Sequence, residues 1–337
     1  MTDAPEYELN PTESDQLAEL VGALKAQGES ATEAAFFDRG WEYRYWLPQG
    51  LSRFLEAFRR TERAAHALIR GFPVDDAVAG PTPAHWKEAA DSRTTEDQEL
   101  LLGLCGLILG EPFTWATLQQ GRLVQNVLPI PGDEHVQNGH GSESLLEFHT
   151  EDGFHPGRCD YLMLFGIRNP DRVPTILASV RDVDLSPRHR QVLAEPRFRI
   201  RPDGEHVRQL AALDPAHPAL ALARRMSESP EPVAALFGDP ERPYLRIDPP
   251  FMDSAPHDRE AREALAALVA ALEDVKSSVV VDSGTLLVLD NYMAVHGRNP
   301  FTPRYDGTDR WLKKLVVSRN LRAGLRAGSA ENPRALF

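Results

Sequence analysis

Two short segments far apart in the chain hold residue types that could bind one metal ion together. The first is residues 148–151, Phe-His-Thr-Glu, and the second is residues 290–298, which contains His296. Two imidazoles and one carboxylate can occupy one face of an Fe(II) ion and leave its other positions open for reactants. This facial triad is used by non-haem iron oxygenases. His149, Glu151 and His296 are therefore the candidate metal ligands and catalytic residues.

The His-x-Glu spacing of the first segment is weak evidence by itself. With 11 histidines and 50 acidic residues in 337 positions, about 1.6 His-x-acid triplets are expected by chance. Its context strengthens it, because residues two apart in a strand point to the same face. His149 and Glu151 would then face one side, with Thr150 turned away. The alternative is that His149 and His296 are hydrogen-bonded or surface histidines. The nine other histidines lack such a setting, although His155 could line the same cavity.

Arg310 is a candidate anion-binding residue, 14 positions after His296. A guanidinium can hold a carboxylate by two parallel charge-assisted hydrogen bonds. In the alternative interpretation Arg310 is an ordinary charge at the edge of a strand. Its position after a candidate ligand makes it a candidate clamp for a dicarboxylate co-substrate.

The elements that must position these residues change in kind along the chain. The spacing of apolar residues predicts helices over residues 12–27 and 48–70. Thr95 and Gln98 predict a capping box for a helix that runs to about Leu109 and stops at Gly110. The first third is therefore expected to be mostly helical. A further helix is predicted after Pro256, because apolar residues recur there along one helical face.

From residue 122 onward short apolar segments separated by turn residues predict strands. The expected strands are 123–128, 161–165, 175–180, 198–200, 233–236, 244–247, 279–281, 286–289 and 315–317. This pattern favours a sandwich or barrel of strands wrapped by helices as one domain. A turn at residues 282–284 would join the two strands before His296. The polar loop at residues 129–147 is long enough to suggest a lid.

Composition excludes several classes of protein. The net charge of −13 argues against non-specific nucleic-acid binding, which needs a basic surface. No apolar segment approaches the roughly 18 residues of a membrane span, and no signal peptide is visible. The two cysteines, Cys105 and Cys159, do not form a disulfide framework. We therefore expect a cytoplasmic protein with no membrane partner. Its oligomeric state is not predicted.

Together these segments resemble the Fe(II)/2-oxoglutarate-dependent oxygenases, and more narrowly the clavaminate synthase-like branch that includes asparagine and arginine 3-hydroxylases. The resemblance extends from about Gly121 to Leu321 and rests on residues 122–129, 148–156, 160–162 and 289–314. It implies a mixed α+β fold, a double-stranded β-helix (jelly roll) of antiparallel strands with surrounding helices. Residues 1–337 would form one domain, with a helical part at 1–120, the jelly roll at 121–321 and a helical insert near 256–275.

The resemblance also implies roles for individual residues. His149, Glu151 and His296 would hold iron, and Arg310 would bind the distal carboxylate of 2-oxoglutarate with help from Thr175. The substrate-binding candidates are Gln125, Glu151, Asp248, Lys314 and, as a substitute for a second aspartate, Asp253. Lys314 stands where arginine-hydroxylating relatives have an arginine that binds the substrate carboxylate. A lysine is cationic but does not form the same fork. Pro249 and Pro250 after Asp248 weaken the case for a paired-carboxylate guanidinium site, and Asp248 could instead be a turn residue.

The implied activity is hydroxylation of a free L-amino acid with Fe(II), 2-oxoglutarate and O2, at Cβ of arginine or an arginine-like residue, in natural-product biosynthesis. The alternatives are desaturation or cyclisation, another substrate such as citrulline, an enduracididine-like residue, asparagine or a carrier-bound residue, and a non-catalytic binding protein on the same fold. Halogenation is disfavoured because Glu151 supplies the carboxylate ligand. The partner is a small molecule.

Overall fold

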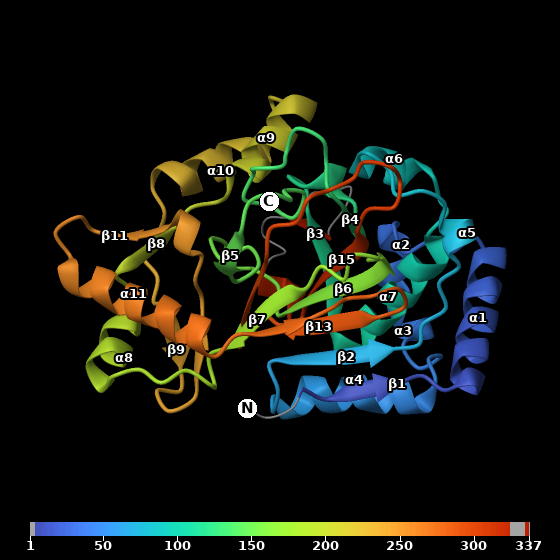
Figure 1. Ribbon diagram of the computed structural model, residues 1–337, viewed down its shortest axis with the longest axis horizontal. Coiled ribbons are helices and arrows are strands. Elements are labelled where there is room, and N and C mark those ends of the chain that lie inside the picture. Colours follow the sequence, from blue (N-terminus) through green and yellow to red (C-terminus); the bar gives the residue numbers. More distant parts are fainter. Residues whose placement is uncertain (1–3, 324–333, 337) are drawn as a thin grey trace.

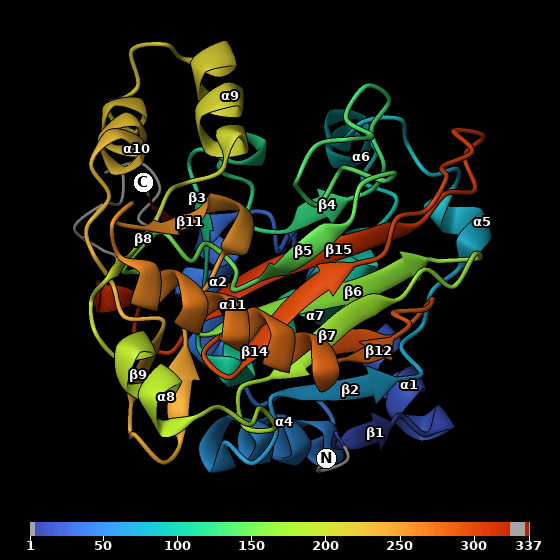
Figure 2. The same ribbon diagram turned by 60° about the vertical axis from the view of Figure 1, so that its left-hand side comes forward.

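Two β-sheets lie face to face between layers of helices (Figures 1 and 2). The structure is a computed structural model that describes residues 4–323 and 334–336. Strands from both ends of the chain join the larger sheet, so the largely helical first third is built into the strand-rich part. Of the part that the structure describes, no helix combines the length and the apolar character needed to cross a membrane.

The larger sheet has eight strands in the order β1-β2-β13-β6-β15-β3-β16, with β4 paired to β15. Its long central strands, β6 and β15, pair antiparallel, while β1 with β2 and β3 with β16 pair parallel. The strands are β1 (Glu6–Glu8), β2 (His66–Arg70), β3 (Glu111–Trp115), β4 (Gln125–Val127), β6 (Tyr161–Arg168), β13 (Leu286–Asp290), β15 (Trp311–Ser318) and β16 (Ala335–Leu336).

The smaller sheet has four antiparallel strands in the order β12-β7-β14-β5, so β5 is an edge strand. They are β5 (Leu146–His149), β7 (Thr175–Ser179), β12 (Ser277–Val279) and β14 (Ala294–Arg298). Two antiparallel pairs complete the strands, β8 (Phe198–Ile200) with β11 (Met252–Ser254), and β9 (Leu236–Gly238) with β10 (Pro243–Leu245).

Helices cover the outer face of each sheet. The helices against the larger sheet include α1 (Pro11–Ala26), α4 (Gln49–Thr61) and α7 (Glu96–Leu109), which share one hydrophobic core with it. Helices α8 (Pro187–Leu193) and α11 (Arg259–Asp274) share a second core with the smaller sheet. The remaining helices are α2 (Ala34–Asp38), α3 (Gly40–Tyr43), α5 (Asp76–Ala79), α6 (Trp86–Asp91), α9 (Gly204–Leu213), α10 (Pro218–Glu228) and the short η1 (Gln119–Gly121), η2 (Pro249–Phe251) and η3 (Leu321–Ala323).

The alternation of side chains along each strand divides the molecule into layers. In β6, Met163 and Phe165 pack with the helices, whereas Leu162 and Leu164 face the space between the sheets. In β7, Ile176 packs toward α8 and α11. Because successive side chains alternate, the inner face of each sheet can carry polar side chains without disturbing the outer cores.

The structure confirms most of the expected elements and corrects some. The helix expected at 48–70 ends at Thr61, and residues 66–70 form β2. The capping box at Thr95 is wrong, because its side chain accepts no cap hydrogen bond and Gln98 donates to the carbonyl of Pro73 instead. Two strands are displaced: the one expected at 233–236 lies at 236–238, and that at 279–281 lies at 277–279. Strand β14, which carries His296, was not predicted.

Candidate metal centre

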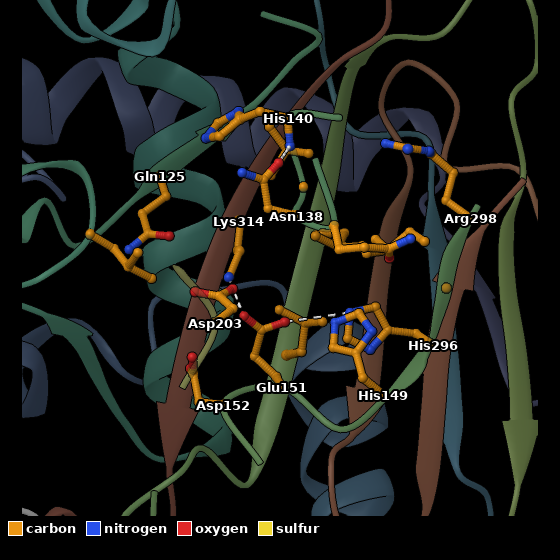
Figure 3. A pocket seen from close by; sticks show the side chains of 18 of the residues that line it. Gln125, Asn138, His140, His149, Glu151, Asp152, Asp203, His296, Arg298 and Lys314 are labelled. Carbon is orange, nitrogen blue, oxygen red and sulfur yellow. Dashed lines mark hydrogen bonds and ion pairs between the residues drawn. The ribbon is translucent and has the colours of Figure 1, made fainter. Parts of the chain in front are cut away.

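His149 and His296 lie directly opposite each other on adjacent strands. His149 ends β5, and His296 in the middle of β14 is its register partner. Their ring centroids are 4.3 Å apart. Glu151 Oε2 is 3.4 Å from His296 Nε2, and one ligand atom from each residue lies within 4.8 Å of the others. Two sequence segments about 140 residues apart therefore form one cluster (Figure 3).

Glu151 reaches this cluster from a turn and not from a strand. Strand β5 ends at His149, so the expectation that both side chains leave one strand is wrong in detail. Thr150 is turned away as expected, because its amide and hydroxyl both donate to the carbonyl of Ile247. The backbone of Glu151 is fixed separately by Asn291, which accepts a bond from its amide and donates one to its carbonyl oxygen.

Gly297, the residue after His296, allows β5 to approach β14 closely. A Cβ at this position would lie 2.5 Å from the carbonyl oxygen of Leu146. A larger residue would therefore push β5 away and separate the two histidines. The glycine beside the second ligand thus has a direct geometric role.

The surroundings keep His149 neutral and Glu151 ionised, as metal ligands must be. Burial, followed by the nearby His296, lowers the pKa of His149 to about 4. Its Nδ1 lies 2.9 Å from the carbonyl oxygen of Glu147, so a proton on Nδ1 leaves Nε2 with a free lone pair. Burial alone would raise the pKa of Glu151, but Lys314 and the two histidines hold it well below its ordinary value.

Lys314 forms an ion pair with Glu151 Oε1 and leaves Oε2 facing His296. Burial acts to lower the pKa of Lys314, but Glu151 and Asp152 raise it, so the ammonium stays charged. Because Lys314 occupies one carboxylate oxygen, the other is the oxygen available to a metal. Two imidazole nitrogens and one carboxylate oxygen, all lining one cavity, fit Fe(II) with open positions.

Arg310 and Thr175 line the same cavity and carry orphaned polar atoms. In residues 4–323 and 334–336, Arg310 Nε and Thr175 Oγ1 are buried with no hydrogen-bond partner. Burial, and then the nearby Arg298, lower the pKa of Arg310 to about 9. Arg298 is itself the register partner of Thr175. Two buried guanidinium groups and an unused hydroxyl fit an oxygen-rich dianion such as 2-oxoglutarate.

Carboxylates gather in another part of the cavity. Asp248 lines it together with Asp152, Asp203 and Glu147. Burial raises the pKa of Asp248 well above its ordinary range, and the neighbouring carboxylates, Asp203 first, raise it further. Figure 3 shows Asp152 and Asp203 on one side of Glu151, and the two histidines on the other. A cationic ligand would relieve the repulsion among these acids.

The remaining predicted substrate residues divide between positions inside and outside the cavity. Gln125 lines the cavity, and its Nε2 donates to Thr114 Oγ1, which leaves its carbonyl oxygen as an acceptor. Asp253 is not among the lining residues. It lies on β11 and pairs with Arg201, so this position does not support substrate contact. His155 likewise lies outside, packed edge-on against Trp115.

Several lining residues were not predicted from the sequence. Asn138 and His140 belong to the 129–147 loop, and Arg298 donates to the carbonyls of Gly141 and Ser144 in that loop. His206, on α9, is buried against Asp152 and Thr117. Asp152 directly follows a predicted ligand, so its position was a usable signal, but no local pattern marks His206.

Comparison with known proteins finds a family of dioxygenases and relatives that hydroxylate amino acids. Residues 48–316 match the family model described as taurine catabolism dioxygenase TauD, TfdA family. An enduracididine beta-hydroxylase of Streptomyces hygroscopicus is 42% identical over 326 residues, which cover 94% of this chain and 95% of that protein. An L-ornithine/L-arginine 3-hydroxylase of Catenulispora acidiphila is 38% identical, with 86% and 87% covered.

Solved structures are also similar. The crystal structure of the non-heme iron oxygenase OrfP in complex with Fe, succinate and (3S)-hydroxy-L-Arg is 39% identical, with a TM-score of 0.93 and coverage of 99% of this chain and 100% of that chain. The same protein in complex with Fe and alpha-ketoglutaric acid gives a TM-score of 0.87 at the same identity and coverage.

Proposed function

The chain belongs to the TauD, TfdA family of dioxygenases, and from this we propose that it hydroxylates a free L-amino acid with a guanidine side chain at Cβ. It is an Fe(II)- and 2-oxoglutarate-dependent enzyme that uses O2. The observation that carries the substrate proposal is the polarity of the cavity. Arg310 and Arg298 line one part, and the carboxylates of Asp152, Asp203 and Asp248 line another.

His149, Glu151 and His296 would hold the iron. Among the described residues they form the cluster of nitrogen and oxygen donors that could bind a metal ion. Bound iron and 2-oxoglutarate together supply the oxidant that removes a hydrogen atom from an unactivated C–H bond. Arg310 would bind the distal carboxylate of 2-oxoglutarate, and Thr175 Oγ1 would donate a further hydrogen bond. The protein's own part is to hold the target Cβ beside this centre and exclude water.

The amino-acid head group would lie near Gln125 and Lys314. The free carbonyl oxygen of Gln125 can accept from the substrate ammonium, and Glu151 offers a carboxylate to the same group. Lys314 would attract the substrate carboxylate, but it already pairs with Glu151. We therefore propose that this carboxylate is bound at one point rather than by a fork.

The side chain would extend toward Asp248 and Asp203. A guanidinium placed there would neutralise Asp248, whose charged form burial destabilises. Arginine fits this chemistry, and so does a cyclic guanidine. The relatives favour the same class, since one is an enduracididine beta-hydroxylase and another acts on ornithine and arginine. A role in natural-product biosynthesis is part of this proposal.

Two segments would cover the bound substrate. The 129–147 loop contributes Asn138 and His140 to the wall, and α9 contributes His206 and Gln209. We propose that they close over the substrate and exclude water. If substrate gives neither segment protection from limited proteolysis, this part of the proposal fails.

The finer fold assignment follows from family membership. We propose that the two facing sheets form a double-stranded β-helix within one domain. We also propose that the enzyme works in the cytoplasm, where a reducing environment keeps Cys105 and Cys159 as the free thiols seen here.

The test is product analysis with a panel of free amino acids, Fe(II) and 2-oxoglutarate. The panel should include arginine, an enduracididine-like cyclic guanidine, citrulline and asparagine. We expect succinate formation and a gain of one oxygen atom with a guanidine substrate. Loss of two hydrogens would show desaturation. Turnover of asparagine or citrulline in preference to both guanidines would contradict the substrate proposal.

A further inference from the structure

A second cavity lies beside the turn that follows the metal cluster. It has a volume of about 110 Å³, and none of the described residues lines both it and the main cavity. The side chains around it come from that turn, the end of β13, the end of β15 and the C-terminal strand. They are Pro156, Gly157, Arg158, Asp160, Tyr292, Ser318, Asn320, Leu321 and Leu336.

Arg158 is the unusual member of this wall. Its side chain is buried, with 5% of the residue exposed. Among the described parts of the chain, neither its Nε nor its Nη2 has a hydrogen-bond partner. The guanidinium stacks on Tyr292, with its Cζ 4.2 Å from the ring centroid, and lies 5.3 Å from that of Phe237. Stacking contacts the faces of the group and leaves its N–H edge unbonded.

Asp160 attracts the Arg158 guanidinium, but no described group forms a hydrogen bond with Nε or Nη2. Asp160 lines the cavity, but its Oδ2 accepts bonds from Ser318 Oγ and the amide of Arg319. Arg246, a partly buried arginine that Arg158 repels, donates to the carbonyls of Gly153 and Phe154 and adds positive charge. A buried cation without a hydrogen-bonded anion is costly, whereas a carboxylate can satisfy two guanidinium N–H groups at once.

We propose that this second cavity, which we call the Arg158 cavity, binds a small carboxylate through the N–H edge of Arg158. Its volume has room for a small carboxylate, since about 10–15 Å³ of such space already holds one water. The other polar side chains on the wall are those of Asp160, Tyr292, Ser318 and Asn320. The site is distinct from the co-substrate clamp, because Arg310 belongs to the main cavity.

A ligand here would act on the metal cluster through the backbone. Arg158 precedes Cys159, whose carbonyl oxygen and Sγ both accept bonds from Asn291. The same Asn291 amide group holds Glu151. A carboxylate that fixes Arg158 therefore stabilises the turn on which the carboxylate ligand stands. Binding should thus raise the unfolding temperature.

The test is thermal unfolding of the full chain during acetate titration, at constant pH and with chloride replaced at constant ionic strength. All measurements use the Arg310→Met protein, so that acetate bound at Arg310 in the main cavity does not contribute to the change in Tm. We expect a saturable rise in Tm of about 2 °C. Adding Arg158→Met should abolish the rise, and Arg158→Lys should weaken it.

Arg181 provides a matched control. It is another partly buried arginine with unbonded nitrogens, stacked on Tyr244, but it lines none of the three cavities described for this chain. Arg181→Met in the same background should keep the acetate response. If Arg158→Met does not fold, Ser318→Ala should still reduce the response.

Two outcomes would overturn the proposal. One is no difference between acetate and chloride in the Arg310→Met protein. The other is an acetate response that survives Arg158→Met, which would mean an adventitious ion only. Since unfolding is measured and not turnover, either outcome leaves the proposed function standing.

Discussion

Asn291 holds Glu151 by both sides of its backbone. Asn291 Oδ1 accepts a hydrogen bond from the amide of Glu151 at 2.7 Å, and Asn291 Nδ2 donates to the carbonyl oxygen of Glu151 at 3.0 Å. Asn291 is 2% exposed and follows β13 directly. The larger sheet therefore sets the position of a carboxylate that completes a cluster on the smaller one.

Replacing this asparagine should weaken metal binding without removing a ligand. Asn291→Ala deletes both hydrogen bonds to Glu151, so the carboxylate loses its fixed position. We expect Fe(II) affinity to fall by about 10- to 100-fold, which is typical for residues that orient a ligand. Anaerobic titration with Fe(II) measures it. Asn291→Asp keeps the acceptor and should lose less; equal affinities in all three proteins would show that Asn291 has no positioning role.

Removing the guanidinium of Arg310 should separate co-substrate binding from metal binding. Arg310→Ala deletes the buried cation proposed to hold the distal carboxylate of 2-oxoglutarate. We expect the 2-oxoglutarate requirement to rise about 100-fold, as for loss of a buried charge-assisted pair, with Fe(II) affinity unchanged. The visible charge-transfer band, titrated without oxygen, reports both. Unaltered 2-oxoglutarate binding would contradict the clamp assignment.

Asp248 and Asp253 form a matched pair of substitutions. Asp248 lines the cavity, whereas Asp253 is outside it and pairs with Arg201. Asp248→Asn should raise the KM for the guanidine substrate about 10- to 100-fold, because a buried charged contact is lost. Asp253→Asn should leave KM within about twofold. Steady-state kinetics with both variants decides, and a larger effect at Asp253 would reverse our placement of the side-chain pocket.

Asp290 should make the protein less stable as the pH rises toward neutrality. Burial raises its pKa from 3.8 to about 7, against opposing hydrogen bonds from the backbone. The folded state therefore binds a proton that the unfolded state releases near pH 4. The contribution of this proton to the free energy of unfolding is complete below about pH 4 and is lost as the pH rises through about 7.

Asp290→Asn should remove that pH dependence and keep the fold. Its side-chain oxygen can still accept the bonds that Asp290 Oδ1 receives from the amides of Tyr292 and Met293. We expect the variant to gain a few kcal/mol relative to the parent between pH 4 and 8. Urea unfolding across this range measures the difference. Parallel curves for the two proteins would argue against a raised pKa.

The sequence predicted the metal cluster because its chemistry is local. The His-x-Glu triplet and the segment around His296 contain residue types that bind metals, so the ligands could be identified from the sequence. The structure brings His149, Glu151 and His296 together. What surrounds them was not predictable in the same way. His206 reaches Asp152 from a helix about 50 residues away, and Asn291 acts through backbone bonds that leave no mark in composition.

The fold was predicted best where periodicity was strong. The apolar segments predicted as strands at 161–165, 286–289 and 315–317 lie in β6, β13 and β15, which are buried on both faces. Strand β14 was missed because Ala294, His296 and Gly297 are not typical strand residues. Pairing with β7 on one side and β5 on the other overrides that weak propensity. The capping box failed because the Gln98 side chain bonds to Pro73 across the chain.

The position of β5 at the border of the smaller sheet has a consequence for the protein without its metal. In the described sheet β5 is joined only to β14, and His149 and His296 form one of its two register contacts. A bound ion would fasten these strands from the side-chain face. Without it, we expect this border to fray and to offer its unpaired backbone groups to other chains. Iron starvation would then cause aggregation as well as inactivity.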